Sequence, residues 1–203
     1  MTDETGSPPH IPLDLTQSIW ERVFTVAPLV LVGSRQEDGS YNLAPKHMAF
    51  PLGWDNYFGF VCTPRHSTYR NIRRDKVFTV SFPRPSQVLL ASLAAGPRQD
   101  DCAKPSLKAL PTVAARQIDG ILVEDSTLCL ECRLEKIVDG FADNSIMAGS
   151  ILAASAREDA LRRSERDDNQ LIFETPLLAY LHPGRFAVVE DSQAFPFPQD
   201  FQR

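Results

Sequence analysis

The sequence predicts a mainly β protein in which antiparallel strands close into a barrel, accompanied by only a few helices. Short runs of apolar and β-branched residues recur along the chain, and turns rich in Gly, Pro and Asp separate them. Apolar residues at helical spacing occur in only a few places. Many short antiparallel strands commonly avoid exposed edges by closing into a barrel. The chain of 203 residues has the length of one such domain.

The first segments are expected to be a flexible arm and a helix. Residues 1–12 contain Gly, Ser and several prolines without periodicity, which predicts the arm. The domain itself is expected to cover residues 13–191. A helix is expected from Asp14 to the stop at Pro28, because apolar residues recur there at helical spacing. These apolar residues are Ile19, Trp20, Val23 and Phe24.

A hairpin is expected next. Residues 29–34 form a short apolar run, and Asp38-Gly39 provides a turn before a return strand that starts at Tyr41. Pro45 has no N–H to donate, so the pairing of this strand should fail or bulge there. Residues 46–51 are therefore expected to form an irregular segment at the end of a strand.

The middle of the chain combines strands with short helices. A first helix should begin at Ser67 or Thr68 and end with Arg74, since basic residues suit a helix C-terminus. A second helix is expected to be capped by Ser86 and to run through Leu93. Residues 57–62 and 77–82 are the expected strands.

The C-terminal half is expected to contain further strands and a charged segment. Residues 98–113 resemble a loop, and the role of residues 97–120 stays open. A hairpin turn is expected around Asp139-Gly140, and the charge run of residues 155–168 predicts a solvated helix or loop. The aromatic tail, residues 192–203, is expected to pack on the surface or on a partner subunit. The expected strands are residues 121–123, 128–138, 177–181 and 186–189.

Composition narrows the class of protein. The net charge of -5 and the pI near 5.4 argue against a broad nucleic-acid-binding surface. The acidic, polar N-terminus and the lack of a long apolar run predict a cytoplasmic protein that does not enter a membrane. Cys129 and Cys132 form a C-x-x-C on an expected strand, where positions three apart face opposite sides. No metal site is therefore expected.

A local basic segment, residues 63–72, follows an expected strand and opens an expected helix. Arg65, Ser67 and Thr68 bring guanidinium and hydroxyl groups to a helix N-terminus, where free N–H groups and the helix dipole favour anions. This pattern predicts a phosphate site. In the alternative interpretation Ser67 or Thr68 is only the helix N-cap, and Arg65 and Arg70 are solvated.

The interrupted strand of residues 42–50 is the second candidate. Unpaired backbone groups beside Pro45 could bind the donor and acceptor edge of a flavin ring. Lys46 or His47 could place positive charge near that ring. The alternative is a β-bulge with a lysine and a histidine on the surface.

Six segments between Pro28 and Ser81 form a recognisable series by their order and spacing. They are Pro28-Leu29-Val30-Leu31-Val32, Asp38-Gly39, Asn42-Leu43-Ala44-Pro45, Arg65-His66-Ser67-Thr68, Asn71-Ile72 and Phe78-Thr79-Val80-Ser81. Through these segments the chain resembles the flavin reductase-like, FMN-binding split-barrel family. The resemblance is strongest from Pro28 to Pro83 and extends more loosely through Leu130-Glu131-Cys132 and Gly149-Ser150-Ile151. Ser67 and Ser81 depart from the family pattern, which often has an acidic residue and an asparagine there.

The resemblance implies a Greek-key split barrel that forms a homodimer, with flavin at the subunit interface. It implies FMN rather than FAD, with the phosphate bound by Arg65, Ser67, Thr68 and Asn71. The ring and ribityl chain would lie along residues 42–50. The residues expected to bind the cofactor are Asn42, Ala44, Pro45, Lys46, His47, Met48, Ala49, Cys62, Thr63, Arg65, Ser67, Thr68 and Asn71.

The implied activity is hydride transfer from NAD(P)H to flavin N5, followed by transfer of electrons to an acceptor. The sequence has no G-x-G-x-x-G motif for a nicotinamide nucleotide, and a split barrel does not require one. His47 is the candidate catalytic residue, for tuning the flavin or delivering a proton, although a packing histidine is the alternative. Two other functions stay open: a non-enzymatic electron-transfer module paired with an oxygenase, and a barrel without cofactor.

Overall fold

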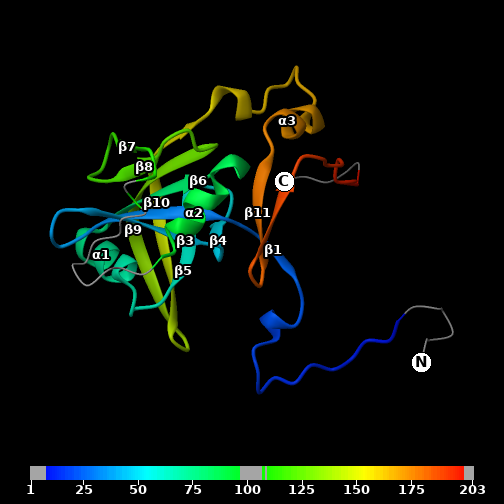
Figure 1. Cartoon of the computed structure of the whole chain (residues 1–203), viewed down its shortest axis with the longest axis horizontal. Helices are drawn as coiled ribbons and strands as arrows, with labels where there is room; N and C mark the ends of the chain where they lie inside the picture. The colour runs from blue at the N-terminus through cyan, green and yellow to red at the C-terminus, as the bar shows by residue number, and fades with distance from the viewer. Residues whose placement is uncertain (1–7, 97–106, 108, 199–203) are drawn as a thin grey trace.

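The computed structural model describes residues 8–96, 107 and 109–198. Its largest element is an antiparallel sheet of seven strands that curls into an open barrel (Figure 1). The strand order is β3-β2-β6-β9-β10-β5-β4, so β3 and β4 form its two edges. The strands are β2 (Val30–Arg35), β3 (Tyr41–Lys46), β4 (Ala49–Pro51), β5 (Tyr57–Cys62), β6 (Val77–Phe82), β9 (Leu128–Phe141) and β10 (Asn144–Ala156).

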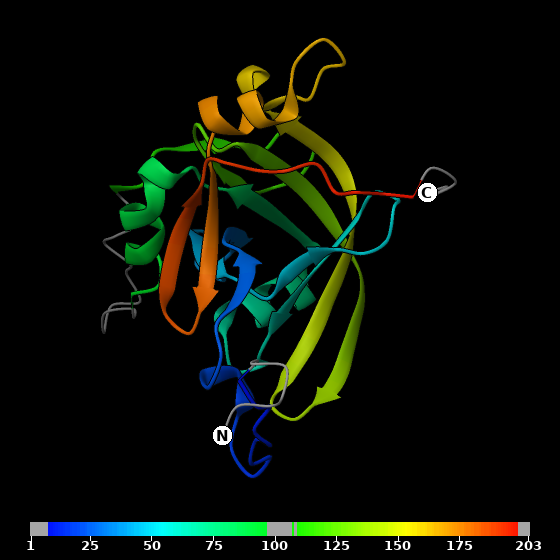
Figure 2. The same cartoon turned by 90° about the vertical axis from the view of Figure 1, so that its right-hand side faces the viewer.

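Two smaller sheets and the helices surround this barrel. A three-stranded sheet of order β1-β11-β12 lies beside the curled sheet (Figure 2). It consists of β1 (Thr25–Pro28), β11 (Leu177–His182) and β12 (Arg185–Val189), and a separate pair consists of β7 (Thr112–Ala114) and β8 (Ile121–Val123). The helices are α1 (Ser67–Asp75), α2 (Val88–Leu93) and α3 (Asp168–Glu174), with short 3-10 turns η1 (Ile19–Glu21), η2 (Pro85–Gln87) and η4 (Glu158–Ala160).

The alternation of side chains along β2 creates two hydrophobic clusters, one on each face of the sheet. Val30 and Val32 point into the barrel, where α1 adds Ile72 to the cluster. Leu31 points to the opposite face and packs with Leu43, with α2 and with β8. Both faces of the strand are buried, which explains its continuous apolar sequence. The barrel predicted from the sequence is confirmed.

The helix α1 begins at Ser67, as the sequence predicts, and ends at Asp75, one residue after the predicted end. Arg73 and Arg74 lie in its last turn, and Lys76 follows in the left-handed conformation with φ 62°. The amide of Lys76 donates to the carbonyl of Ile72 at 2.9 Å and closes the helix. One face of α1 packs into the barrel, so its start is held close to the sheet.

The helix predicted from Asp14 is wrong. Only η1 forms there, and Thr25–Pro28 is a strand that pairs with β11, from Thr25 opposite His182 to Pro28 opposite Ala179. Pairing with a strand from the far end of the chain overrides the helical spacing of the apolar residues. Residues 8–18 extend away from the body of the molecule (Figure 1).

The predicted failure of pairing at Pro45 is also wrong. Pro45 lies in register opposite Leu31, and β3 continues to Lys46. Because β3 is an edge strand with one neighbour, proline removes no hydrogen bond that a second neighbour would need. The expected irregular segment shrinks to His47 and Met48, since residues 49–51 form β4.

The hairpin of β9 and β10 turns at Ala142 and Asp143, three residues later than predicted. Gly140, with φ 108°, lies within β9 instead of forming the turn. The sequence does not predict β10, whose small residues give little strand signal. The predicted charged segment begins with the end of β10 and leads into α3, where Asp167 accepts a hydrogen bond from the amide of Gln170.

Three smaller expectations have mixed outcomes. Ser86 does not cap the second helix, because the turn η2 begins earlier, at Pro85. Cys129 and Cys132 are free thiols that point apart: Cys132 packs into the barrel, while Cys129 donates to the carbonyl of Val123 at 3.9 Å. Cys102, most of the loop of residues 98–113 and both chain ends lie outside the described residues.

Candidate functional site

A cleft of about 330 Å³ lies on the edge strand β3, between the start of α1 and the end of α2. We call it the α1 cleft. It brings together six of the residues that the sequence predicts to bind a cofactor, although they come from two separate segments. Its walls are formed by Asn42, Ala44, Pro45, Lys46, His66, Ser67, Thr68, Ala94, Ala95 and Gly96.

The N-terminus of α1 opens into this cleft. His66 occupies the N-cap position in an extended conformation, and its side chain makes no capping hydrogen bond. The amide of His66 donates to the carbonyl of Thr63 at 3.0 Å, which fixes the turn before the helix. The amides of the first turn and the positive end of the helix dipole are therefore suited to bind an anion.

A buried polar pair supports the wall of the cleft. Asn42 is 3% exposed and Thr68 is 2% exposed. The side-chain amide of Asn42 donates to Oγ1 of Thr68 at 3.3 Å, linking β3 to α1. Because this hydroxyl already accepts a hydrogen bond, its own proton is free to point toward a ligand.

The cleft carries a local positive potential in an otherwise acidic protein. Burial lowers the pKa of His66, and the neighbouring charges of Lys46, Arg65 and Arg70 lower it further. Lys46 also lies against the buried thiol of Cys62, whose pKa burial raises and Lys46 partly lowers. A negative ligand would relieve the repulsion among these cations.

Thr63, Arg65 and Asn71 do not line the α1 cleft, whereas Ser67 and Thr68 from the same segment do. Nη2 of Arg65 lies 2.8 Å from Oδ2 of Asp143 on the β9–β10 hairpin, in a largely exposed ion pair. The side chain of Asn71 is buried and donates to Oγ of Ser34 at 3.2 Å. Their predicted contacts with phosphate stay predictions. Oγ1 of Thr63 accepts from the amide of Arg65 at 3.4 Å.

Two further hollows adjoin the α1 cleft. A middle pocket of about 350 Å³ shares Pro45 with it, and also contains His47 and Tyr180. A larger apolar cavity of about 860 Å³ shares His47 with the middle pocket. The predicted residues Met48 and Ala49 line this apolar cavity. Its other walls are Ser18, Trp20, Thr25, Val26, Ala27, Pro28, Phe50, Val61, Phe141, Asn144, Ile146 and His182.

His47 stands where the middle pocket meets the apolar cavity. Its ring stacks on Tyr180 with a centroid distance of 4.4 Å, and on His182 with 5.3 Å. Burial lowers its pKa, and the nearby charges of His182 and Lys46 lower it further. The imidazole is therefore neutral at pH 7.

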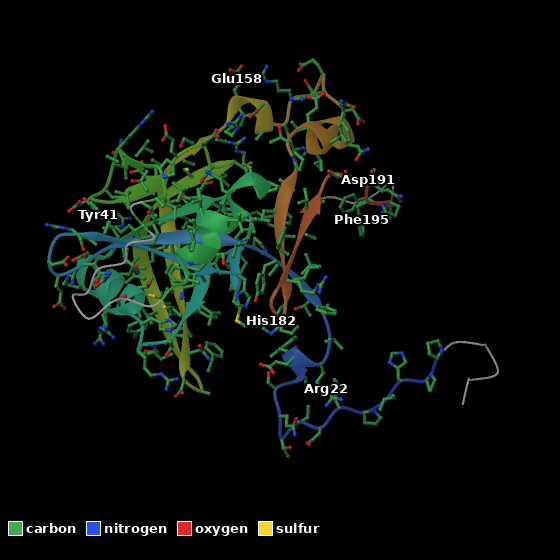
Figure 3. The ribbon with its side chains drawn as sticks, viewed as in Figure 1. Arg22, Tyr41, Glu158, His182, Asp191 and Phe195 are labelled. Carbon is green, nitrogen blue, oxygen red and sulfur yellow. The ribbon has the colours of Figure 1, made fainter. Side chains whose placement is uncertain are left out.

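Sequence reasoning missed the second face of this site. Tyr180 and His182 come from β11, at the C-terminal hairpin, and His182 lies near its tip (Figure 3). The two residues are two positions apart, so they share one face of the strand. A tyrosine and a histidine two positions apart at the end of an expected strand were the sequence feature that could have indicated a second face of the site. The end of α2, residues 94–96, gave no such signal.

The family model described as "Flavin reductase like domain" matches residues 23–187. The chain belongs to the flavin reductase-like family. The matched range runs from just before β1 into β12, and of the described residues that line the three hollows only Ser18 and Trp20 lie outside it. The resemblance stated from the sequence is confirmed, and the family makes this chain a flavin-dependent oxidoreductase domain.

Solved structures share the fold at low sequence identity. The 2-nitrobenzoate 2-nitroreductase of Pseudomonas fluorescens has a TM-score of 0.77 and 21% identity, covering 96% of this chain and 99% of that chain. Component B of the nitrilotriacetate monooxygenase of Bacillus cereus has a TM-score of 0.79 and 16% identity, covering 93% of this chain and 100% of that chain. A Shewanella frigidimarina protein with a split barrel domain has a TM-score of 0.74 and 15% identity, covering 85% and 87%. The fold of this chain is thus a split barrel.

Within the described ranges, no three His, Cys, Asp or Glu side chains gather where they could hold a metal ion. Among the helices that the structure describes, none is long and apolar enough to cross a membrane.

Proposed function

We propose that this flavin reductase-like domain binds FMN along β3, with the phosphate in the α1 cleft and the flavin ring near His47. The observation that carries the proposal is the α1 cleft itself. It combines an uncapped helix N-terminus, the hydroxyl groups of Ser67 and Thr68, and the ammonium group of Lys46. Each of these groups is a donor or a positive charge, which suits a phosphate.

The proposed cofactor is FMN rather than FAD because of this chemistry. FMN ends in a phosphate monoester that carries close to two negative charges at neutral pH. Burial lowers the pKa of His66, and the positive charges of Lys46, Arg65 and Arg70 lower it further, so the start of α1 is locally positive although Arg65 is paired with Asp143. The phosphate of FMN would match this positive potential, and because FMN ends there, the cleft need not hold the adenosine part that FAD would add.

The adjoining hollows offer a path for the remainder of the cofactor. Pro45 joins the α1 cleft to the middle pocket, and His47 joins the middle pocket to the apolar cavity. A molecule with a phosphate at one end and a planar ring at the other would follow the edge of β3 past these two residues. Backbone groups of His47 and the amide of Met48, which lie between β3 and β4, would meet the polar edge of the ring, since the carbonyl of Met48 already accepts from the amide of Val61 at 2.8 Å.

The proposed activity is oxidation of NAD(P)H with transfer of the electrons to an acceptor. Bound FMN supplies the hydride chemistry, and the protein binds, orients and shields the reacting rings. The Asn42–Thr68 pair holds the phosphate end, and Lys46 adds positive charge beside the ring. The neutral His47 could exchange a proton with an acceptor at its Nε2 atom, in keeping with its predicted catalytic role.

A homodimer is part of the same proposal. The apolar cavity is bordered by exposed apolar side chains of Trp20, Val26, Met48 and Phe50. Such a surface is suited to burial against a second subunit, which would cover the ring of the cofactor. We propose that flavin lies at this interface and that the protein works in the cytoplasm.

Flavin binding tests the first part of the proposal. The purified protein should show flavin absorbance, and the chromophore released by heat should run as FMN on chromatography. Thr68→Val keeps the shape of the side chain but removes the hydroxyl, so the Kd for FMN should rise about tenfold or more. Thr16→Val makes the same change on the exposed N-terminal segment and should leave the Kd unchanged. Equal Kd values for both variants would exclude phosphate binding in the α1 cleft.

Turnover tests the second part. Flavin-dependent oxidation of NADH or NADPH should exceed the background rate of free flavin. Bound FMN without nicotinamide oxidation would instead indicate an electron-transfer module that a partner protein reduces. A colourless protein whose melting temperature does not respond to FMN would indicate a barrel without cofactor.

A further inference from the structure

Two imidazole rings meet in the apolar cavity, and they come from opposite parts of the chain. His47 follows the edge strand β3, and His182 ends β11 at the tip of the C-terminal hairpin (Figure 3). The rings are nearly parallel, with an interplanar angle of 20° and a centroid distance of 5.3 Å. The ring of Tyr180 also stacks on His47, with a centroid distance of 4.4 Å, so two rings fix the position of His47.

Each imidazole has one buried nitrogen without a partner. Nε2 of His47 and Nδ1 of His182 are inaccessible to solvent, and no described residue forms a hydrogen bond with either atom. A buried polar atom without a partner is costly, and proteins rarely keep two of them close together without a use. These atoms therefore point to a ligand that offers polar atoms at this place.

The surroundings limit the kind of ligand. The cavity has about 860 Å³, and its walls are mostly apolar, with the aromatic rings of Trp20, Phe50 and Phe141 among them. Among the residues that the structure describes, no carboxylate or arginine side chain lines it. A charged ligand would lose its hydration without gaining a counterion, whereas a flat, neutral molecule with a polar oxygen would be well accommodated.

We propose that His47 and His182 bind the carbonyl oxygen of a flat aromatic electron acceptor of the quinone class. The proposal rests on the proposed function, because it names the acceptor for the same flavin site. Neutral imidazole carries one N–H, so each ring can donate a hydrogen bond to a carbonyl oxygen. Because burial and its neighbours lower the pKa of His47, this ring keeps its neutral form at pH 7.

The reaction balances with these groups. NAD(P)H gives up a hydride, which carries two electrons, and becomes NAD(P)⁺. The quinone gains two electrons and two protons and becomes a hydroquinone. One proton equivalent comes with the hydride, and the second comes from solvent through the imidazole N–H that holds the carbonyl oxygen.

A binding experiment can test this proposal without relying on turnover. The chain has two tryptophans, Trp20 in the wall of the cavity and Trp54, which is 90% exposed. In the Trp54→Phe background, fluorescence quenching of Trp20 by menadione reports binding in the cavity. His182→Phe keeps a ring in the stack but removes both nitrogens, so the Kd for menadione should rise about fivefold.

Two further variants sharpen the result. His182→Asn places an amide near the position of Nδ1, so its Kd should lie closer to that of the unmodified protein than the Kd of His182→Phe does. His10→Phe makes the matched change on the exposed N-terminal segment and should leave the Kd unchanged. Equal menadione affinity in His182→Phe and His10→Phe overturns the proposal.

Turnover then separates this proposal from the proposed function. Ferricyanide accepts single electrons and needs no hydrogen bond to a carbonyl oxygen. The ratio of kcat/KM for menadione to that for ferricyanide should fall about fivefold in His182→Phe and stay constant in His10→Phe. A constant ratio in His182→Phe counts against the imidazole site. If the unmodified protein reduces neither acceptor but binds menadione through His182, the proposed function fails and the quinone site stands.

Discussion

Asn42 and Thr68 illustrate how single buried polar residues can prepare a binding site. Both side chains are almost fully buried, and each satisfies a hydrogen-bonding group of the other. Burying these two polar groups therefore costs little free energy of folding, while the hydroxyl of Thr68 stays at the wall of the α1 cleft. At the residue scale, the site is held by contacts that exist before any ligand arrives.

The lowered pKa of His47 predicts how stability depends on pH. The folded state disfavours the charged imidazole, so the unfolded chain binds more protons below its ordinary value of 6.5. The free energy of unfolding should therefore fall as the pH drops from 7 through 6.5 and toward the lower pKa of the folded state.

Chemical denaturation between pH 5 and pH 7.5 measures this effect. His47→Phe should reduce the slope of stability against pH, although His66 keeps part of it because its pKa is lowered too. His10→Phe is the matched control on the exposed N-terminal segment. An unchanged slope in His47→Phe would show that the stack tolerates a charged imidazole.

At the scale of elements, a buried carboxylate joins β9 to the loop between β7 and β8. Glu131 is 5% exposed and accepts hydrogen bonds from the amides of Arg116, Gln117 and Ile118, at 2.9, 2.6 and 3.2 Å. Three donors around one carboxylate compensate for the cost of burying its charge. The loop is therefore anchored to the barrel through one side chain.

Glu131→Gln should destabilise the protein by about 2 kcal/mol, since the new amide group is neutral and presents a donor to backbone donors. Glu135→Gln, on the same strand but at the surface, should have a much smaller effect. Urea denaturation of both variants checks the difference. Similar losses in the two variants would mean that the loop does not depend on the Glu131 carboxylate.

A glycine on β10 allows two strands and a core ring to approach closely. A methyl group at Gly149 would lie 2.7 Å from the carbonyl oxygen of Arg133 and 2.7 Å from the ring of Phe78. The pairing of β9 and β10 shifts register between Ala148 and Gly149, so the strand bends at this place.

Gly149→Ala should lower the free energy of unfolding by about 1 to 3 kcal/mol through overpacking. Ala154→Ser lies on the same strand with an exposed side chain and should change stability by less than about 0.5 kcal/mol. Thermal or urea unfolding distinguishes them. A stable Gly149→Ala variant would require the ring of Phe78 to move without cost.

The sequence reveals the strands that are continuous apolar runs and misses those defined by distant partners. β2, β5 and β6 consist of apolar and β-branched residues, so local pattern is sufficient to predict them. β1 forms only because β11, from the other end of the chain, pairs with it. Tyr180 and His182 reach the site through this same sheet, so no local pattern around His47 could predict their contact.

At the scale of the whole molecule, apolar surface gathers around one cavity while the chain as a whole is acidic. Trp20, Val26, Met48 and Phe50 line the apolar cavity and keep substantial exposure. A net charge of -5 keeps molecules apart in general, so a specific apolar contact is needed for two copies to associate. This distribution of exposed apolar side chains favours one defined interface between two copies of the chain.

Light scattering should therefore give a mass close to twice the 22.6 kDa of the chain. Val26→Asp places a charge beside the cavity and should weaken both association and FMN binding, because the proposed interface covers the flavin ring. Phe173→Asp makes the same change at another exposed apolar residue, on α3 and outside the apolar cavity, and should affect neither. A monomer with full FMN affinity would exclude the dimer from the proposed site.

Pro45 has a consequence for how the protein avoids aggregation. It sits near the end of β3, which is a free edge of the main sheet. A bare edge strand can recruit strands from other molecules, and a residue without an N–H interrupts the hydrogen bonds that such recruitment needs. The same position borders the α1 cleft, so the groove is kept open for a small molecule instead of being filled by a foreign strand.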